Sequence, residues 1–518
     1  MVVNEQKYDR QLRLWASDGQ QDLEESHVCL INATSTGCEI LKNLVLPNVG
    51  QFTIIDGESI SERDLSSNFF LEEGDYGKLR AAVATESLKE LNPSVHGQYL
   101  GTSIDDFLIE HCSVSSFWNK FSLIIFTSSF KYNVSFHKLV SLIYGKIPIL
   151  EANSVGFYGS LKLIFNERTI IQTHLNEIPD LRIDLPWPEL SDYLNGLNIE
   201  KLSIEELKNI PYSLLLMNFR RKYVDATGNE KPTRKDFKKF VETDELVKDI
   251  RYAALENIEE LLKFSWRGTT RTTIPSTIQQ ILEDSNTLSS PLSSSPFWVL
   301  VKALKRFVNE NGCLPLSGKI VDMASSTEKY IELQKLYREK AEKDKKLIEE
   351  YASDISAECI VSQALLDNFC KNSQYLVVQK GSKDFVNNKM VNAILTGDNS
   401  SRVSIQMAFL TLGVFCENHE HQYPKMEDLP ELIDITETRF LNGNKVPLSS
   451  KGGDEDSKYI KTLKEFIRME GCEMINTASF IGGLGGQEAL KILTNQYVPL
   501  NNTLVYDGIE SSIEKWKV

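Results

Sequence analysis

Residues 30–37 of the chain read LINATSTG, and this stretch is the clearest indication of the fold class. An apolar strand leads into it, and a helix is expected directly after it at residues 38–46. This strand–turn–helix order opens a nucleotide-binding α/β unit, whose glycine-rich turn normally lets the backbone approach a phosphate. Here only Gly37 remains, and the β-branched Thr34 and Thr36 each put a Cβ atom where the phosphate would approach. The sequence therefore predicts a nucleotide-site scaffold that has lost its phosphate loop.

Length, charge and cysteine content narrow the class of protein. A chain of 518 residues is too long for one ordinary core, so we expect two or three domains. The net charge of -15 argues against binding to nucleic acid or to an anionic membrane surface. No apolar run approaches the ~18 residues needed to span a bilayer, and the start of the chain has no apolar signal-peptide core. Eight cysteines without paired spacing fit a reducing compartment, so we expect a cytoplasmic and nuclear protein.

Strands and helices alternate in the first part of the chain. Further apolar strands are expected in QFTIIDG, LIIFTSS and IPILEANS, and this order predicts a largely parallel sheet covered by helices. From about residue 168 the pattern is mostly helical and includes a long helix expected at residues 327–355. A helix and an apolar strand, NTLVYDG, return near the end. We therefore expect an α/β domain formed by residues 1–167 and completed by 476–518, with 168–475 as a helical insertion.

Two further features each allow a binding role and a structural one. The glycine run at residues 482–486 fits either a second phosphate loop or close helix packing. Packing is favoured, because no apolar strand leads into the run and Glu488 takes the sixth position of a GxGxxG counted from Gly483. Asp56 closes the second expected strand, where a ribose would be held. With the loop glycines lost, a turn or capping role for Asp56 is at least as well supported.

Metal and thiol chemistry have little support in the sequence. Cys416, His419 and His421 are ligand types, but no second pair with zinc-site spacing accompanies them, so we expect no metal. Cys313 is the one loop cysteine of interest, and the absence of a nearby histidine in the sequence disfavours it as a catalytic thiol.

The N-terminal KYDRQLRLW is a short amphipathic segment. Tyr8, Leu12 and Leu14 form its apolar side, and Arg10 and Arg13 lie beside them. Taken alone, these arginines are most simply surface residues of a docking helix.

Together these segments resemble the ubiquitin-like-modifier activating enzymes. The resemblance rests on KYDRQLRLW, LINATSTGCEILKNLVLP, FTIIDGESI and SNFFL, and it continues in IPSTIQQILED, FWVLVKALKRFV, LPLSGKIVDM, KLYREKAEKD and GGQEALKILTNQYVPLNNT. It covers nearly the whole chain and is closest to the regulatory subunits of neddylation-pathway activating enzymes (the APP-binding-protein or Ula type). It implies a Rossmann-like pseudo-adenylation domain of the ThiF/MoeB type, with a large, mostly helical insertion similar to half of a catalytic-cysteine domain.

Three parts of the ATP site found in the active half of this family differ here. The active half has a GAGGLG loop where this chain has residues 32–37. It has an NRQ triplet that contacts ATP where this chain has Ser66, Ser67 and Asn68. It has a metal- and ATP-associated Asp where this chain has Ser128. The resemblance therefore implies that this chain binds no cofactor or metal and has no activity alone.

The resemblance also gives Arg10 a role. In this family the arginine of the YDRQ motif is similar to an arginine finger that reaches across the dimer to the partner's ATP phosphates. Lys78 resembles a lysine of the active half but is expected to be structural here. The implied partners are a catalytic subunit that holds ATP, magnesium and the catalytic cysteine, a Nedd/Rub-type ubiquitin-like protein, and indirectly a conjugating enzyme. The implied pathway is cullin neddylation.

Three alternatives remain open. A regulatory subunit of the SUMO-activating enzyme is a relative, but such chains are much shorter and the long helical insertion disfavours it. A nucleotide- or NAD-dependent oxidoreductase would need the lost glycines. A pure scaffold with a dead Rossmann-like fold differs from the preferred function only in what Arg10 does.

Overall fold

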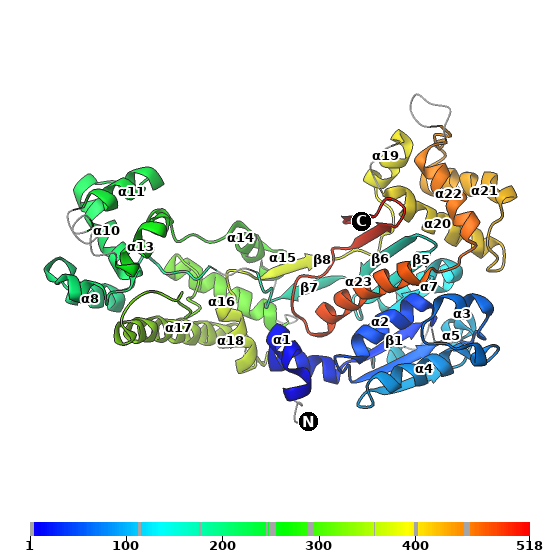
Figure 1. The fold of residues 1–518 in the computed structure, drawn as a ribbon, viewed down its shortest axis with the longest axis horizontal. Coiled ribbons are helices and arrows are strands. Elements are labelled where there is room, and N and C mark those ends of the chain that lie inside the picture. Colours follow the sequence, from blue (N-terminus) through cyan, green and yellow to red (C-terminus); the bar gives the residue numbers. More distant parts are fainter. Residues whose placement is uncertain are drawn as a thin grey trace. The chain divides into compact units, whose positions relative to one another are not determined.

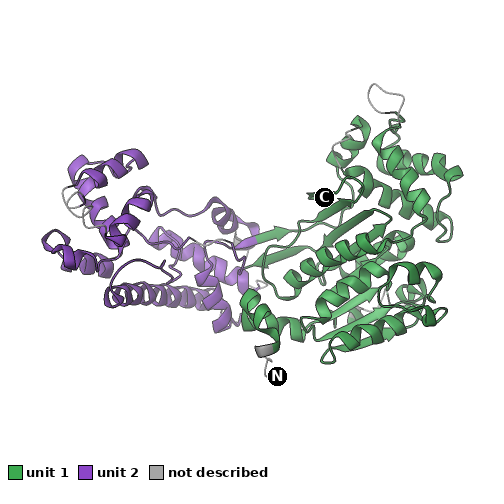
Figure 2. Ribbon diagram, in the orientation of Figure 1, with its two compact units in different colours: residues 1–170, 378–518 green, residues 171–377 purple. Residues whose placement is uncertain are grey.

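The computed structural model describes residues 5–111, 115–175, 178–244, 247, 255–288, 295–356, 358–397, 402–449 and 456–518. The chain divides into two compact units, which Figure 2 colours separately. The first, here called the α/β unit, contains residues 1–170 and 378–518. The second, the helical unit, contains residues 171–377.

An eight-stranded sheet forms the centre of the α/β unit, in the order β10-β9-β6-β5-β4-β1-β2-β3 (Figure 1). Strands β1 to β5 pair in parallel, and β6, β9 and β10 extend the sheet antiparallel. The strands are β1 (His27–Ile31), β2 (Gln51–Ile55), β3 (His96–Leu100), β4 (Leu123–Thr127), β5 (Ile149–Val155), β6 (Tyr158–Ile164), β9 (Thr503–Asp507) and β10 (Ser512–Trp516). A separate two-stranded sheet pairs β7 (Glu167–Ile170) with β8 (Val377–Lys380). The strands predicted at β1, β2, β4, β5 and β9 are confirmed.

Helices cover both faces of the large sheet, which explains why its central strands β4, β5 and β6 are buried along their whole length. On one face lie α2 (Ser35–Val45), α4 (Arg80–Leu91) and α23 (Ile475–Leu493). On the other lie α5 (Ile104–His111) and α7 (Asn133–Ile143). Apart from α20 (Val403–Asn418) and α22 (Lys458–Met469), the other described α-helices of the unit are α1 (Glu5–Glu25), α3 (Glu62–Ser67), α6 (Ser115–Trp118), α19 (Asn388–Thr396) and α21 (Leu429–Ile435).

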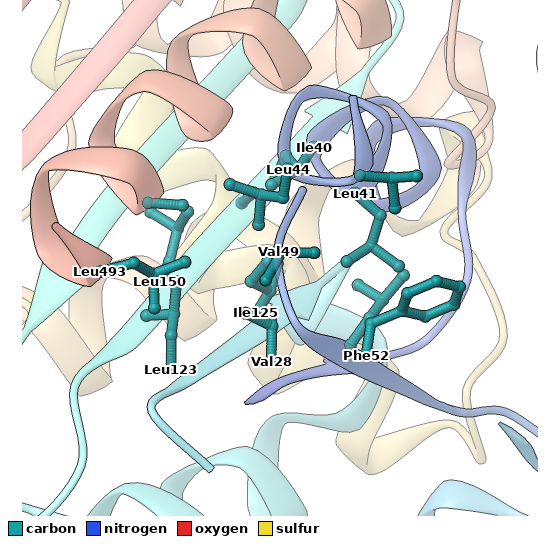
Figure 3. Close-up of a cluster of buried hydrophobic side chains, with 14 of the residues drawn as sticks. Val28, Ile40, Leu41, Leu44, Val49, Phe52, Leu123, Ile125, Leu150 and Leu493 are labelled. Carbon is teal, nitrogen blue, oxygen red and sulfur yellow. The ribbon is translucent and has the colours of Figure 1, made fainter. Parts of the chain in front are cut away.

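Figure 3 shows the core under α2, where Ile40 and Leu44 of the helix lie over Val28 and Ile125 of the strands. All four side chains are fully buried. Burying a side chain of this size stabilises the fold by about 1.5–3 kcal/mol. The core therefore fixes α2, and with it the turn at its N-terminus.

The glycine run lies inside α23 and packs this helix closely against α2. Figure 1 shows the two helices side by side, although they are far apart in the sequence. A Cβ atom added to Gly482 would lie 2.3 Å from Cβ of Glu39, and one added to Gly486 would lie 2.5 Å from Cβ of Asn43. The packing role predicted for the glycine run is confirmed for Gly482 and Gly486. The whole run lies within the helix, which starts at Ile475.

Neighbouring glycines of α23 should respond in opposite directions to alanine. Gly482→Ala forces the two helices apart, and we expect it to lower the free energy of unfolding by about 1–3 kcal/mol. Gly483 has nothing within 4 Å of an added Cβ atom. We therefore expect Gly483→Ala to raise the free energy of unfolding by about 0.5–1 kcal/mol through helix propensity. Urea unfolding of both variants checks this pair, and destabilisation of equal size in both would contradict the close packing.

The helices of the last third of the chain belong to the α/β unit because they pack on its strands. α20 (Val403–Asn418) and α22 (Lys458–Met469) bring Phe409 and Phe466 to a common cluster with Tyr158 of β6. The rings of Phe466 and Tyr158 stack with their centroids 5.5 Å apart.

This packing moves the expected domain limit. The sequence predicted one helical insertion over residues 168–475. In the structure the helical unit begins close to that point, at residue 171, but it ends at residue 377. The helices between residues 378 and 475 are therefore part of the α/β unit.

The helical unit has its own core, centred on α17 (Thr327–Ile355), whose predicted bounds are confirmed. Leu333 and Tyr337 of this helix are fully buried, and the Tyr337 hydroxyl donates a hydrogen bond to the carbonyl oxygen of Leu181. The other helices are α8 (Pro188–Gly196), α9 (Ile204–Leu207), α10 (Tyr212–Thr227), α11 (Arg234–Thr243), α13 (Glu256–Lys263), α14 (Ser276–Glu283), α15 (Ser285–Leu288), α16 (Pro296–Asn311) and α18 (Gln363–Lys371). Within the described ranges of both units, every helix is too short or too polar to cross a membrane.

His27, at the start of β1, makes the stability of the α/β unit depend on pH. Burial, aided by the charge of Lys120, lowers the pKa of His27 from 6.5 to about 4, and its Nε2 lies 2.8 Å from the Thr53 hydroxyl. Because the unfolded chain takes up this proton first, stability is lost as the pH falls from about 6.5 to about 4. We expect His27→Gln to lose less stability than the wild type between neutral pH and about pH 5. Urea midpoints at the two pH values measure this, and an equal loss in both proteins would contradict it.

Candidate functional site

A polar cavity of about 220 Å³ lies at the carboxyl ends of β1, β2 and β4. The chain leaves β1 toward β2 on one side and returns at β4 on the other, so this edge is the switch point of the sheet. Open α/β sheets bind their ligands at such a point. The lining residues of this degenerate site are Asn32, Thr34, Ser35, Glu58, Ser59, Ser61, Arg63, Asp64, Ser67, Arg80, Ser128, Lys131, Tyr423, Gly471, Cys472 and Glu473.

The turn between β1 and α2 is held by its own polar side chains. Asn32 has a φ of 71°, a left-handed conformation that asparagine tolerates, and its amide donates a 2.9 Å hydrogen bond to the Thr127 carbonyl. Thr34 caps α2, and its hydroxyl accepts a hydrogen bond from the Gly37 amide. The residues that replaced the expected glycines therefore stabilise the turn themselves.

Arg80 occupies the centre of the degenerate site and is bound by the chain itself. Its Nε donates to Asp56 at 2.7 Å, its Nη1 to Asp64 at 2.6 Å and its Nη2 to Asn32 at 2.7 Å. Burial opposes the charge of Arg80, but the two carboxylates outweigh it and raise the pKa of Arg80 above its ordinary value. Burial raises the pKa of Asp64, yet Arg80 and hydrogen bonds from Ser61 hold it below its ordinary value.

Asp56 therefore serves the turn and this ion-pair network. Its Oδ2 accepts from the Ala33 amide at 2.9 Å as well as from Arg80, and its Oδ1 accepts from the Glu58 amide at 2.8 Å. With these three donors in place, the fully buried side chain is used within the protein. The structural alternative for Asp56 is supported.

Glu473, from the connection between α22 and α23, reaches the N-terminus of α2. Its Oε2 accepts from the Thr36 amide at 3.1 Å and its Oε1 from the Thr36 hydroxyl at 2.7 Å. Burial raises the pKa of Glu473, opposed by the hydrogen bonds from Thr36 and Thr34 and by the charge of Arg80. A carboxylate of the chain thus binds where a helix N-terminus favours an anion.

The other residues singled out at this site also have partners within the chain. Ser67 and Ser128 both line the cavity. The Ser67 carbonyl accepts from the Ser35 hydroxyl at 2.7 Å, and the Ser128 amide donates to the Ala152 carbonyl at 3.2 Å. Asn68 lies behind the cavity, where its Oδ1 accepts from the Phe70 amide.

Sequence reasoning missed Arg80 and Glu473, two charged residues that line the site. It singled out Lys78, which lies at the surface and pairs with Asp75 at 2.8 Å. Arg80, two residues later at the start of α4, is the one that enters the cavity. Arg80 could have been predicted from Asp56, because a buried aspartate needs a cation or other donors close to it. No sequence motif relates Glu473 to the turn.

Arg10 lies on a segment that is anchored at both ends. At one end, buried Tyr8 accepts a hydrogen bond from the Asn92 amide group. At the other, α1 departs from helical geometry at Trp15, whose carbonyl accepts from the Gln496 side chain at 2.9 Å. Arg10 is exposed between these anchors, and no described residue forms an ion pair or hydrogen bond with its side chain.

Arg13 and Leu14, which also belong to the amphipathic pattern, differ in their environment. Arg13 is exposed and pairs with Asp9 at 3.0 Å. Leu14 was expected on the apolar side, but its side chain is 53% exposed. The break in α1 after Leu14 explains this difference, because the segment does not continue as one regular amphipathic helix.

The candidate metal and thiol residues lie in separate environments. His419 is paired with Glu431 and His421 with Asp105, while Cys416 is fully buried and burial raises its pKa to about 12. Across the residues that the structure describes, no group of three or more metal-ligand side chains is close enough to hold an ion. Cys313 is buried, with its sulfur 2.9 Å from Nη1 of Arg182.

Comparison with known proteins places the whole chain in one family. Residues 8–518 match the ThiF family. The chain is 32% identical to the NEDD8-activating enzyme E1 regulatory subunit of Gallus gallus, over 98% of this chain and 97% of that protein. It is 33% identical to the Xenopus laevis protein of the same name, over 98% and 97%. It is 30% identical to the NEDD8-activating enzyme E1 regulatory subunit AXR1 of Arabidopsis thaliana, over 100% of this chain and 97% of that protein. The chain therefore belongs to the ThiF family and, within it, to the NEDD8-activating enzyme E1 regulatory subunits.

Proposed function

We propose that this chain is the non-catalytic half of a heterodimeric activating enzyme for a NEDD8-type (Nedd/Rub) ubiquitin-like protein, in the pathway that neddylates cullins. The partner subunit holds ATP and magnesium, adenylates the C-terminal glycine of the modifier and captures it on a cysteine. This chain supplies the second half of the adenylation dimer. It acts in the cytoplasm and nucleus.

One contrast carries this proposal. The nucleotide end of the sheet is lined by Arg80 and Glu473, both bound to other groups of the chain. Arg10, by comparison, is an exposed cation on an anchored segment. A chain whose own site has its charged groups paired with one another, and which presents a cation at its surface, fits a subunit that assists another site.

Arg10 would act on the partner's nucleotide in trans. Its guanidinium is permanently charged and planar, so it can bind two phosphate oxygens at once. Charge that develops on the phosphates during adenylation would be stabilised by this group. The anchors at Tyr8 and Trp15 limit the entropy lost when the arginine is positioned.

Two of the cysteines of the helical unit, Cys313 and Cys370, lie in surroundings that disfavour thioester formation on them. Cys370 is buried, and burial raises its pKa to about 12, so it is a poor nucleophile. Cys313 is buried beneath Arg182. We propose that the helical unit instead helps to form the groove that admits the modifier and the conjugating enzyme.

Modifier-dependent ATP–pyrophosphate exchange tests the proposed function. We expect no exchange from this chain alone and robust exchange when the partner subunit is added with the modifier. A matched reaction with a SUMO-type modifier and the same partner is the specificity control, and we expect it to stay at background. Exchange by this chain alone would contradict a non-catalytic role, and equal use of both modifiers would contradict the NEDD8-type assignment.

A further inference from the structure

We propose that Glu473 is a built-in anion that occupies the phosphate end of the degenerate site. In a working site of this architecture, the N-terminus of the first helix binds a phosphate through its backbone N–H groups. In this chain a glutamate of the same polypeptide takes that place. The inference rests on the geometry of the turn and does not depend on the role of Arg10, so either can fail without the other.

The contact has the form expected of an anion at a helix N-terminus. Thr36 is the second residue of α2, and its amide has no acceptor within the helix. The two oxygens of Glu473 receive this amide and the Thr36 hydroxyl, a two-point contact at 3.1 and 2.7 Å. The β-branched residue that excludes a phosphate therefore also provides a donor for the carboxylate.

The backbone around Glu473 is fixed, so the carboxylate does not depend on a mobile surface side chain. The Gly156 amide donates to the Cys472 carbonyl at 2.8 Å, and Gly156 and Glu473 form a parallel bridge. Gly156 has a φ of 55°, and a Cβ atom there would lie 2.5 Å from Cγ of Met469, so a larger residue could not hold this connection as closely. The sheet itself thus places Glu473 at the helix.

The cations that line the cavity are also engaged. Arg80 is bound by Asp56 and Asp64. Lys131 pairs with Glu58 at 3.2 Å, and Arg63 pairs with Glu470 at 2.8 Å. Each lysine and arginine in the described lining therefore already has a carboxylate partner. An incoming phosphate would have to displace Glu473 at the helix without an unpaired cation to help it.

This arrangement gives the half-site a permanent internal ligand. The turn and α2 are held in the anion-bound form in the absence of nucleotide, so the α/β unit keeps the same conformation whether or not ATP is present. The loss of the loop glycines and the presence of Glu473 are then two parts of one adaptation.

Removing the carboxylate should open the site to inorganic phosphate. The test uses the full chain, with thermal unfolding followed as phosphate is titrated at constant ionic strength. We expect Glu473→Ala to unfold at a lower temperature than the wild type and to recover as phosphate is added, with an apparent affinity at least about tenfold higher than that of the wild type. The charge control is Glu86→Ala, which removes an exposed glutamate of α4 that pairs with Lys89 at the surface. It should respond to phosphate as the wild type does.

Two outcomes would overturn the proposal. In the first, phosphate raises the unfolding temperature of all three proteins equally. In the second, it raises the unfolding temperatures of Glu473→Ala and Glu86→Ala by the same amount. If Glu473→Ala does not fold, Glu473→Gln keeps the size of the side chain and one acceptor but removes the charge. In that variant we expect the Thr36 amide to exchange its hydrogen roughly tenfold faster than in the wild type. An unchanged exchange rate in Glu473→Gln would also contradict the proposal.

Discussion

Replacing Arg10 by alanine should lower modifier-dependent ATP–pyrophosphate exchange of the assembled heterodimer by about 100-fold or more. The exposed guanidinium forms no ion pair or hydrogen bond with a described residue of its own chain, so we expect its removal to leave the fold intact. The loss should appear mainly in kcat, because the arginine stabilises charge that develops during the reaction. Gel filtration with the partner checks that the variant still assembles.

Arg13 provides the matched control for this experiment. It lies three residues away on the same segment and is equally charged, but it is paired with Asp9. We expect Arg13→Ala to exchange within about threefold of the wild type. Arg10→Lys should recover only part of the activity, because an ammonium cannot reproduce the two-point contact of a guanidinium. An Arg10→Ala variant that assembles and exchanges normally would reduce this subunit to a scaffold.

Replacing Arg80 by methionine should lower the free energy of unfolding by about 3–5 kcal/mol. The change leaves the fully buried Asp56 and the largely buried Asp64 without their shared cation, and the methionine cannot replace the hydrogen bond to Asn32. Asp64, whose pKa Arg80 now holds below its ordinary value, loses that stabilisation. Its contribution is present at neutral pH and is lost as the pH falls, so urea unfolding should be measured near pH 7.

Lys78 serves as the control for Arg80. It lies two residues earlier, its side chain is 59% exposed and it pairs with Asp75. We expect Lys78→Met to change the free energy of unfolding by no more than about 1 kcal/mol. An equally small loss of unfolding free energy in Arg80→Met and Lys78→Met would contradict a stabilising role for the buried network around Arg80.

The strands of the α/β unit are predicted correctly from the sequence where burial on both faces produces a run of apolar residues. β1, β2, β4 and the start of β5 are largely apolar because helices cover them on both faces. β3 and β10 were missed because they are the two edge strands of the sheet, and their residues alternate or are largely exposed. The limit at residue 475 was misplaced because helices that pack on the sheet have the same periodicity as helices of a separate unit.

In the candidate site, features that depend on neighbouring residues could be predicted, whereas contacts between residues far apart in the sequence could not. NATSTG alone predicts the loss of the phosphate loop, since the steric argument concerns adjacent residues. Glu473 could not be predicted in this way, because it comes to Thr36 from 437 residues away in the sequence. Arg80 was overlooked in favour of Lys78, since the start of α4, not the motif, decides which of the two side chains enters the cavity.

The stoichiometry of ATP binding distinguishes a non-catalytic half-site from a working one. Equilibrium dialysis of labelled ATP, without modifier, should be carried out on this chain alone and on the purified heterodimer. We expect this chain to retain no ATP and the heterodimer to bind one ATP, held by the partner. Two ATP molecules per heterodimer, or ATP retained by this chain alone, would contradict it.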